Sequence, residues 1–251
     1  MQARVPVFMF HHVEADDAST HRSALFVSQS KLHEIADWFL ERGFESISVK
    51  RLAECLDGGD TASLNRKFVF TFDDGARNNF EYAYPLLSSI GCTATFYVPT
   101  DYIGMSSDWR KKKNRSFEIM GEDEILALSR DGFEIGSHGC KHTDLTALAF
   151  AELNRQMLDS KAVLSGLIGS DVVTFAYPYG LFDARVVECA KQAGYSAACS
   201  TIRGATQDSK HAFILKRIMV TEGTGSIRLR YFMSGLLDFE YRKEFRAAVS
   251  G

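Results

Sequence analysis

The chain has 251 residues, of which 45% are hydrophobic and 24% are charged. Its formal net charge of -3 at pH 7 gives no electrostatic reason to expect binding to nucleic acid or to an anionic membrane surface. No run of about 20 apolar residues occurs, so the sequence predicts no membrane-spanning segment. The length is typical of one α/β barrel, and we predict a single domain over residues 1–251.

The cysteines and the N-terminus both bear on the cellular compartment. The five cysteines are odd in number and include no Cys-x-x-Cys pair, which favours reduced thiols buried in the core. No apolar leader precedes the strand that we predict from Val5 to Phe10. Together these observations predict a cytoplasmic protein.

Strands and helices are predicted to alternate along the chain, a pattern typical of a parallel α/β sheet. Helical spacing of apolar residues predicts helices over residues 26–42, 49–56, 78–90, 122–130, 147–167 and 182–193, and a helical tail over 226–249 that is broken near Gly235. Short apolar runs predict strands over residues 5–10, 44–48, 67–72, 93–98, 132–135, 172–176, 195–200 and 213–220.

One long connection, residues 99–121, has no predicted helix or strand. It contains Trp109 and a basic run, Arg110-Lys111-Lys112-Lys113. Long loops inside compact domains are usually functional or disordered. The basic run is either a solvated surface segment or a rim that contacts a phosphate or an acidic sugar.

The predicted strand over residues 67–72 runs directly into Asp73, Asp74 and Gly75. Parallel sheets carry their chemistry at the carboxyl ends of their strands. Asp-Asp-Gly can also be a simple turn with a helix cap. Because successive side chains of a strand point to opposite sides, the two carboxylates can take different tasks, one binding a metal and the other handling a proton.

A second polar stretch contains His138 and His142, after the predicted strand over residues 132–135. Two imidazoles four residues apart can converge on one ion if the backbone between them turns helically. Two histidines and one aspartate form a common ligand set for a catalytic metal that keeps an open coordination position.

The stretches TFDDG (71–75), SHGCKH (137–142) and FAYPYG (175–180), in this order and spacing, resemble the polysaccharide deacetylases, the NodB-homology carbohydrate esterases. The resemblance extends from Val5 to about Val220. It implies an α/β fold, a distorted (β/α)7-type barrel, with a divalent metal. It also implies hydrolysis of an N-acetyl group on a sugar.

The resemblance further implies roles for individual residues. Asp74, His138 and His142 correspond to the metal ligands, and Asp73 to the base that removes a proton from water. The backbone N–H of Tyr179 corresponds to an oxyanion donor. Zn2+ is the expected ion, although this donor set also admits other first-row metals. Two aromatic residues are either core residues or a stacking wall for a sugar: Tyr177 and Trp109.

Two departures from the family pattern lead to further predictions. Ala176 stands where many members have an arginine that pairs with the catalytic aspartate. We expect Arg217 to replace it, because a guanidinium within a strand needs a partner if it is buried. The alternative is that Arg217 faces outward.

The family's usual leucine-histidine stretch near the C-terminus is also missing. An apolar strand ending in histidine stands first in the chain instead, as in a circularly permuted barrel. We therefore predict His11 as the general acid. His12 is expected to point away by strand alternation and to have a structural or supporting role. The alternative is that both histidines are incidental.

The combined prediction is a metal-dependent hydrolase that removes N-acetyl groups from a saccharide, an intracellular precursor of a surface glycan that is lipid-linked or nucleotide-linked. Two alternatives remain open. One is hydrolysis of a non-sugar amide or cyclic imide on the same barrel. The other is a catalytically inactive sugar-binding protein.

Overall fold

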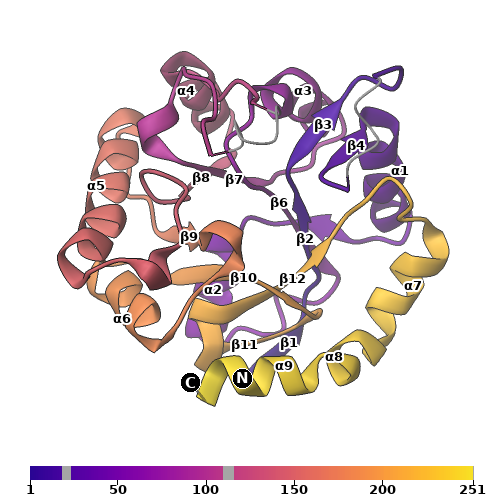
Figure 1. The fold of residues 1–251 in the computed structure, drawn as a ribbon. Helices are drawn as coiled ribbons and strands as arrows, with labels where there is room; N and C mark the ends of the chain where they lie inside the picture. The colour runs from indigo at the N-terminus through magenta and orange to yellow at the C-terminus, as the bar shows by residue number, and fades with distance from the viewer. Residues whose placement is uncertain (19–23, 110–115, 251) are drawn as a thin grey trace.

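The structure, a computed structural model, describes residues 1–18, 24–109 and 116–250. Seven parallel strands form a closed barrel with helices around it (Figure 1). This confirms the predicted (β/α)7-type fold. In order around the barrel the strands are β2 (Val7–Phe10), β12 (Leu215–Met219), β10 (Ala197–Arg203), β9 (Thr174–Ala176), β8 (Glu134–Ser137), β7 (Thr95–Val98) and β6 (Lys67–Phe72), which pairs with β2 again.

Strand β2, the first barrel strand in the sequence, closes the barrel because it pairs with both β12 and β6. On one side of β2, Phe8 is in register with Ile218 of β12, and on the other side Phe10 is in register with Phe72 of β6. The residues that follow β2 and β6 therefore reach the same edge of the barrel, at neighbouring positions.

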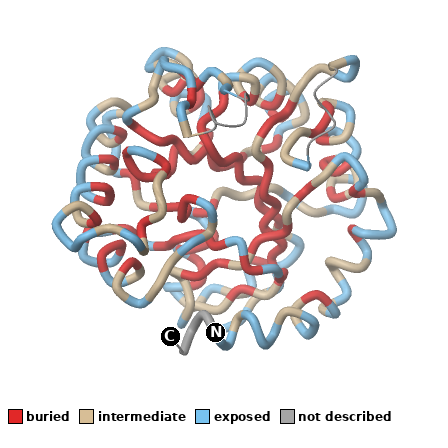
Figure 2. Tube along the Cα trace, viewed as in Figure 1, coloured by how far each residue is buried: buried red, intermediate tan, exposed pale blue. Residues whose placement is uncertain are grey.

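Two sets of buried apolar side chains follow from strand alternation. Phe8 and Phe10 of β2 belong to the large cluster that packs between the strands and the surrounding helices. Val7, one residue away from Phe8, belongs to a second cluster with Tyr97 and Cys199 of other strands. Figure 2 shows the result, buried strands at the centre and helices whose outer sides are exposed.

The helices of the described residues agree with the sequence in approximate position, and the tail, predicted with one break near Gly235, holds three helices. Helix α4 has its predicted bounds, and Gly235 adopts φ 87 between α7 and α8. The helical bounds are α1 Gln29–Leu40, α2 Val49–Asp57, α3 Tyr84–Ser89, α4 Glu122–Arg130, α5 Phe150–Ile168, α6 Ala184–Gln192, α7 Ser226–Ser234, α8 Leu236–Glu240 and α9 Arg242–Ser250. A π-helical turn, Asn79–Ala83, precedes α3.

The predicted helix over residues 26–42 begins later than its apolar pattern indicates. Phe26–Ser28 is a short strand, β4, paired in parallel with β3, His12–Glu14. Ser28 has extended backbone angles, and its hydroxyl accepts a hydrogen bond from the backbone N–H of Lys31. This cap starts α1 at Gln29.

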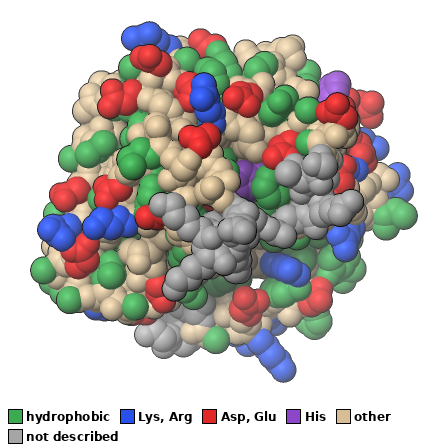
Figure 3. Space-filling model, turned by 45° about the horizontal axis from the view of Figure 1, so that its top comes forward, with side chains coloured by type: hydrophobic (Ala, Val, Ile, Leu, Met, Phe, Trp, Pro, Cys, Tyr) green, Lys and Arg blue, Asp and Glu red, His purple; other side chains and the backbone are tan. Residues whose placement is uncertain are grey.

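Two other short strands also escaped prediction, because three residues are too few to show an alternating pattern. They are β1, Gln2–Arg4, and β11, Thr206–Asp208, which pair with each other in antiparallel fashion. The strand predicted over residues 44–48 is present but shorter, as β5, Glu45–Ser46, which pairs with the first residues of β6. None of the helices in the described ranges is long and apolar enough to cross a membrane. Figure 3 shows acidic and basic side chains interspersed over one tilted face of the molecule.

Candidate active site

The carboxyl ends of the barrel strands surround a cavity of about 190 Å³. His11 follows β2, Asp73 and Asp74 follow β6, and His138 follows β8. The lining includes six residues that the sequence singled out for catalysis or metal binding: His11, Asp73, Asp74, His138, His142 and Tyr179. It also includes Gly180, the last residue of the FAYPYG stretch, and two residues that the sequence gave no reason to choose, Leu25 and Thr201.

Backbone strain is concentrated at this cavity. Among the described residues, four that are not glycine have positive φ: Arg66 (53°), Asp74 (70°), His142 (46°) and Tyr179 (60°). The last three line the cavity. Left-handed backbone in residues with a Cβ is costly and is found mainly where function requires it.

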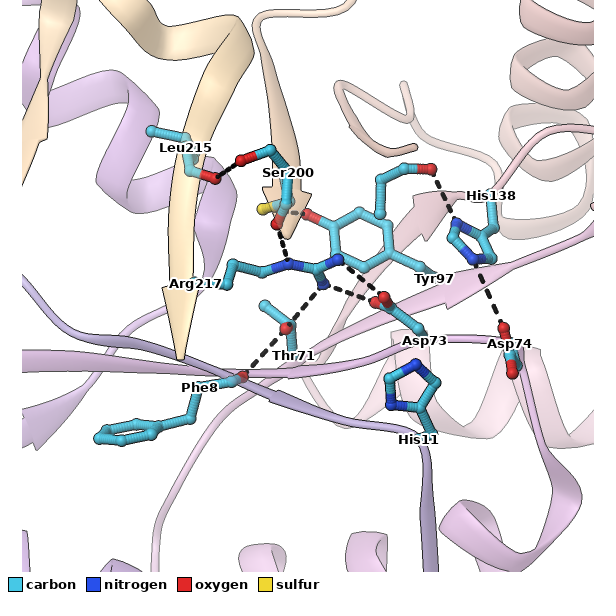
Figure 4. Close-up of polar contacts among 12 residues, drawn as sticks. Phe8, His11, Thr71, Asp73, Asp74, Tyr97, His138, Ser200, Leu215 and Arg217 are labelled. Atoms are coloured by element: carbon cyan, nitrogen blue, oxygen red, sulfur yellow. Dashed lines mark hydrogen bonds and ion pairs between the residues drawn. The ribbon is translucent and has the colours of Figure 1, made fainter. Parts of the chain in front are cut away.

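Asp74, His138 and His142 form a buried cluster that could hold a metal ion. One ligand atom from each lies within 4.8 Å of the others. Oδ1 of Asp74 is 2.9 Å from Nε2 of His142 and 3.5 Å from Nε2 of His138. Nδ1 of His138 donates to the carbonyl oxygen of Ala176 at 2.7 Å, which aims Nε2 at Asp74 (Figure 4).

The chemistry of this cluster fits a divalent ion. Two imidazole nitrogens and one carboxylate oxygen are typical of zinc and related metals at catalytic sites. Burial raises the pKa of Asp74, but His142 and His138 outweigh it and hold the pKa well below its usual value. Asp74 is therefore an ionised oxygen donor.

The two histidines converge by a route that differs from the expected helical turn. Residues 138–142 form a loop in which Gly139 has φ 75 and His142 has φ 46. The ring centroids of His138 and His142 are 4.8 Å apart. The rings are thus brought together by a loop with two left-handed residues and not by a helical turn.

Asp73 is paired with Arg217 across the barrel interior (Figure 4). Nη1 and Nη2 of Arg217 donate to Oδ1 and Oδ2 of Asp73 at 2.6 and 2.7 Å. Arg217 is 1% exposed, so the alternative in which it faces outward is wrong. Its other hydrogen bonds go to the Ser200 carbonyl at 2.8 Å and the Thr71 hydroxyl at 3.1 Å.

This pair determines the charge of Asp73. Burial raises the pKa of the carboxyl, but the Arg217 guanidinium, together with His138 and His11, outweighs that effect and the pKa lies below its usual value. The partner that the sequence lacks at Ala176 on β9 thus comes from β12. The catalytic roles of Asp73 and Arg217 stay predictions.

His11 lies beside the two aspartates, with its ring turned toward them (Figure 4). Its carbonyl oxygen accepts a hydrogen bond from Nδ2 of Asn79 at 2.7 Å, while Oδ1 of Asn79 accepts from the N–H of Val13 at 3.0 Å. Burial lowers the pKa of His11 despite the nearby charges of Asp74 and Asp73. When protonated, this ring is therefore a stronger acid than an ordinary histidine.

His12 points away from the site, as strand alternation predicts. It is fully buried, and its ring stacks on Phe26 with centroids 4.3 Å apart and planes 13° apart. The edge of its ring meets Phe117 at 4.3 Å. Asn79, which fixes the backbone around both histidines, was missed, because one asparagine near the start of a helix carries no signal of its own.

The turn Pro178–Gly180 presents Tyr179 at the cavity. Tyr179 has φ 60 and Gly180 has φ 70. A Cβ on Gly180 would lie 2.0 Å from Oγ1 of Thr201, so only glycine fits there.

The two aromatic candidates for a sugar wall differ. Tyr177 is fully buried, its ring stacks on Phe182 with centroids 5.0 Å apart, and its hydroxyl donates to the Phe213 carbonyl at 3.0 Å. Although Tyr177 also lines the cavity, these contacts favour the core alternative. Trp109 lines the cavity and stacks on the ring of His142, with centroids 4.5 Å apart and planes 14° apart. The basic run over residues 110–113 lies outside the described residues.

Comparisons with known proteins agree with this arrangement. A family model described as polysaccharide deacetylase matches residues 62–198. YxkH of Bacillus subtilis (strain 168), whose name places it among polysaccharide deacetylases, is 23% identical over 221 residues, which cover 88% of this chain and 73% of YxkH. Poly-beta-1,6-N-acetyl-D-glucosamine N-deacetylase of Staphylococcus aureus (strain MSSA476) is 21% identical over 205 residues, which cover 78% of this chain and 68% of that protein.

Solved structures share the fold. The Streptococcus pyogenes deacetylase PplD, determined in complex with acetate, superposes with a TM-score of 0.80 at 19% identity, and the match covers 93% of this chain and 100% of PplD. At this identity the similarity concerns the barrel itself.

Proposed function

We propose that this chain, which belongs to the polysaccharide deacetylase family of hydrolases, removes N-acetyl groups from a saccharide with the help of a divalent metal. One observation carries the proposal. The Asp74, His138 and His142 cluster and the buried Asp73–Arg217 pair lie at one cavity, with His11 beside both carboxylates. Metal-dependent amide hydrolysis uses these three elements: a site for a metal, a base and an acid.

Asp74, His138 and His142 would hold the ion, for which zinc is our proposal. When bound, such an ion polarises a carbonyl group and lowers the pKa of water toward ~7. The carbonyl of Ala176 fixes the ring of His138, and the face of Trp109 covers the ring of His142. Both contacts orient the donor nitrogens before any ligand arrives.

Asp73 would act as the base. The water oxygen attacks the amide carbon while its proton passes to Asp73. Arg217 keeps this carboxylate ionised and fixes the plane of its two oxygens through two parallel hydrogen bonds. The backbone N–H of Tyr179 would donate to the oxygen that becomes negative, because a donor in a rigid turn needs no rearrangement.

His11 would act as the general acid. The C–N bond breaks as the imidazolium of His11 gives its proton to the amine nitrogen, leaving acetate and a free amino sugar. Burial lowers the pKa of the ring, so the protonated form is a stronger acid than a free imidazolium. Asn79 holds the backbone of His11 in place from the opposite side.

The name of the Staphylococcus aureus relative specifies a polymer of N-acetylglucosamine, and for this chain we propose an N-acetylated hexosamine glycan. We further propose that the substrate is a lipid-linked or nucleotide-linked precursor in the cytoplasm. Cell fractionation would test the compartment independently of the chemistry.

The direct test is acetate release from N-acetylglucosamine oligomers by the metal-loaded protein. We expect turnover that a chelator abolishes and added zinc restores. Hydrolysis of simple amides or cyclic imides with no acetate from any saccharide would instead favour the non-sugar hydrolase. Metal and glycan binding with no turnover on either panel would favour a sugar-binding protein.

A further inference from the structure

A second cavity, larger than the catalytic one, lies at the same edge of the barrel. Its volume is about 460 Å³, against about 190 Å³ for the catalytic cavity. Arg203 and Met219 contribute from the carboxyl ends of β10 and β12, and Arg228 and Leu237 contribute from α7 and α8. Figure 1 shows these two helices passing beside the ends of the same strands.

Strand β10 connects the two cavities. Thr201 lines the catalytic cavity, and Arg203, two residues farther along the strand, lines the second one. Thr201 and Arg203 are exposed, while Ile202 between them is buried. Residues two apart in a strand lie about 7 Å from each other on the same side. A sugar adjoining one in the catalytic cavity would therefore reach the second cavity.

The second cavity presents two arginines. Nη1 of Arg203 donates to the hydroxyl of Tyr241 at 2.6 Å, and its guanidinium carbon is 5.1 Å from the centre of that ring. Within the described part of the chain, neither Arg203 nor Arg228 forms an ion pair with a carboxylate. Glu240 also lines the cavity, where its carboxylate accepts a hydrogen bond from the hydroxyl of Tyr231.

The remaining lining suits a sugar ring. Tyr231, Phe232 and Tyr241 offer aromatic surface, and Ile218 and Leu237 add apolar surface. Aromatic rings pack against the C–H faces of sugars, and their hydroxyls supply hydrogen bonds at the edge. Aromatic and apolar walls with two guanidinium groups form a surface for a sugar that carries a negative charge.

We propose that this cavity binds an anionic group, a phosphate or a carboxylate, carried by the glycan next to the N-acetylated sugar. The inference rests on the proposed function and specifies its substrate class. Guanidinium groups match the paired oxygens of both anions. Arg203 is held in position by Tyr241, so little side-chain freedom is lost when the anion binds.

Binding can be measured without turnover, by calorimetry on the metal-loaded protein carrying Asp73→Asn. Three hexasaccharides serve as probes. One is neutral N-acetylglucosamine hexamer, the second carries a 1-phosphate at its reducing end, and the third alternates glucuronate with N-acetylglucosamine. Each is titrated into this background and into the same background with Arg203→Gln, Arg228→Gln or Arg230→Gln. Arg230 is the matched control, since it is exposed on α7 but does not line the cavity.

We expect at least one acidic hexamer to bind about tenfold more tightly than the neutral one, with the difference shrinking as salt is added. Arg203→Gln and Arg228→Gln should each reduce that preference severalfold, and Arg230→Gln should keep it. The preferred acidic probe then identifies phosphate or carboxylate. Equal affinity for all three probes, or a preference that survives both cavity substitutions, would overturn the proposal.

The result of these titrations does not depend on whether the protein catalyses the proposed deacetylation. Acetate release by the wild-type protein tests the reaction, whereas these titrations test the anion site alone. If Arg203→Gln impairs folding through the lost Tyr241 contact, Arg228→Gln still decides the question, because Arg228 is exposed on a helix.

Discussion

The pair formed by Arg217 and Asp73 places two opposite charges where almost no solvent reaches them. Arg217 is 1% exposed and Asp73 is 3% exposed. A buried pair of this kind contributes little net stability, but removal of one partner leaves an uncompensated charge. Besides Asp73, the guanidinium contacts Ser200 of β10 and Thr71 of β6, so two other strands fix its place in the interior.

Arg217→Met should lower the free energy of unfolding by about 3 kcal/mol, because Asp73 then remains buried without its partner. The double variant Arg217→Met with Asp73→Asn should recover about 1 kcal/mol or more of this loss. Urea denaturation measures both. The exposed pair of Arg51 and Glu54 is the control, and Arg51→Met should change stability by less than about 1 kcal/mol. If Arg217→Met lowered the free energy of unfolding no more than Arg51→Met does, the result would contradict the pairing.

The two adjacent histidines should respond differently to truncation. His11→Ala should keep the metal and lose about 100-fold or more in kcat, since a general acid contributes roughly that factor. His12→Ala should reduce stability more than turnover, because its ring fills a buried space against Phe26 and Phe117. Acetate release, metal content and thermal unfolding measured together distinguish the two. Unchanged turnover in His11→Ala would refute its role as the acid.

At the scale of elements, the turn Pro178–Gly180 shows how a short segment controls a catalytic group. Gly180 has φ 70, and a Cβ there would be 2.0 Å from Oγ1 and 2.7 Å from Cβ of Thr201. The turn is therefore locked against β10. Any side chain at Gly180 must push apart the segment that carries the backbone N–H of Tyr179.

Gly180→Ala should destabilise the protein by more than about 1 kcal/mol and lower kcat about tenfold or more by displacing the Tyr179 N–H. Gly91→Ala is a matched control, because Gly91 has a similar φ of 69 with nothing within 4 Å of a new Cβ. It isolates the cost of the backbone angle. Adding Thr201→Gly to Gly180→Ala should restore part of the turnover. The idea fails if Gly180→Ala costs no more stability than Gly91→Ala and keeps full turnover.

The elements that the sequence predicted well are those with a long periodic pattern. Helix α4 was predicted with its observed bounds, and β6 was predicted from its continuous apolar run. Strands β3 and β4 were not predicted, because three residues show no period and Phe26 continues the apolar pattern of α1. Tertiary pairing decided the structure of that segment.

The loop that carries Trp109 shows a different limit. The sequence predicted a long irregular connection there, and two isolated bridges, Ser106 with Glu118 and Ala76 with Ile119, order parts of it. That Trp109 would cover His142 could not be predicted, since the two residues are 33 positions apart and neither has a pattern that points to the other.

At the scale of the whole molecule, the catalytic cavity and a stabilising hydrogen-bond network around Glu134 lie at opposite ends of the barrel. Glu134 begins β8, at the end of the barrel opposite the catalytic cavity. Its carboxylate accepts hydrogen bonds from the hydroxyls of Thr95 and Thr174, on the two neighbouring strands, and from the backbone N–H of Lys50 at the start of α2. One side chain thus links three strands to the helix below them.

This anchor makes stability depend on pH. Burial raises the pKa of Glu134 above its ordinary value of 4.5, although the hydrogen bonds from Thr174, Lys50 and Thr95 oppose the shift. A carboxyl whose pKa is raised by folding stabilises the protein below pH 4.5, and that contribution is lost as the pH rises through the folded-state pKa.

As the pH rises from below 4.5 to above the folded-state pKa of Glu134, the Glu134→Gln variant should therefore gain stability relative to the wild type, because an amide does not ionise. Urea denaturation of both proteins across that range measures the difference in the free energy of unfolding. A difference that stays constant with pH would show that Glu134 titrates alike in the folded and unfolded chains.

The barrel and most of the site could be predicted because each depends on local sequence, an apolar strand followed by polar residues at its carboxyl end. Asp73, Asp74 and His138 were found in this way. The Asn79 contacts and the cavity beside Arg203 could not be, since they depend on how the π-helical turn and helices α7 and α8 pack against strands distant in sequence.

The proposed mechanism depends most on Asp73 as the base beside a metal site, and one measurement tests this role directly. Asp73→Asn and the wild type are loaded with zinc, their metal content is determined, and acetate release from N-acetylglucosamine oligomers is followed. We predict equal metal content and a fall in kcat of about 100-fold or more, since an amide accepts no proton from water. Full turnover in metal-loaded Asp73→Asn would contradict the account.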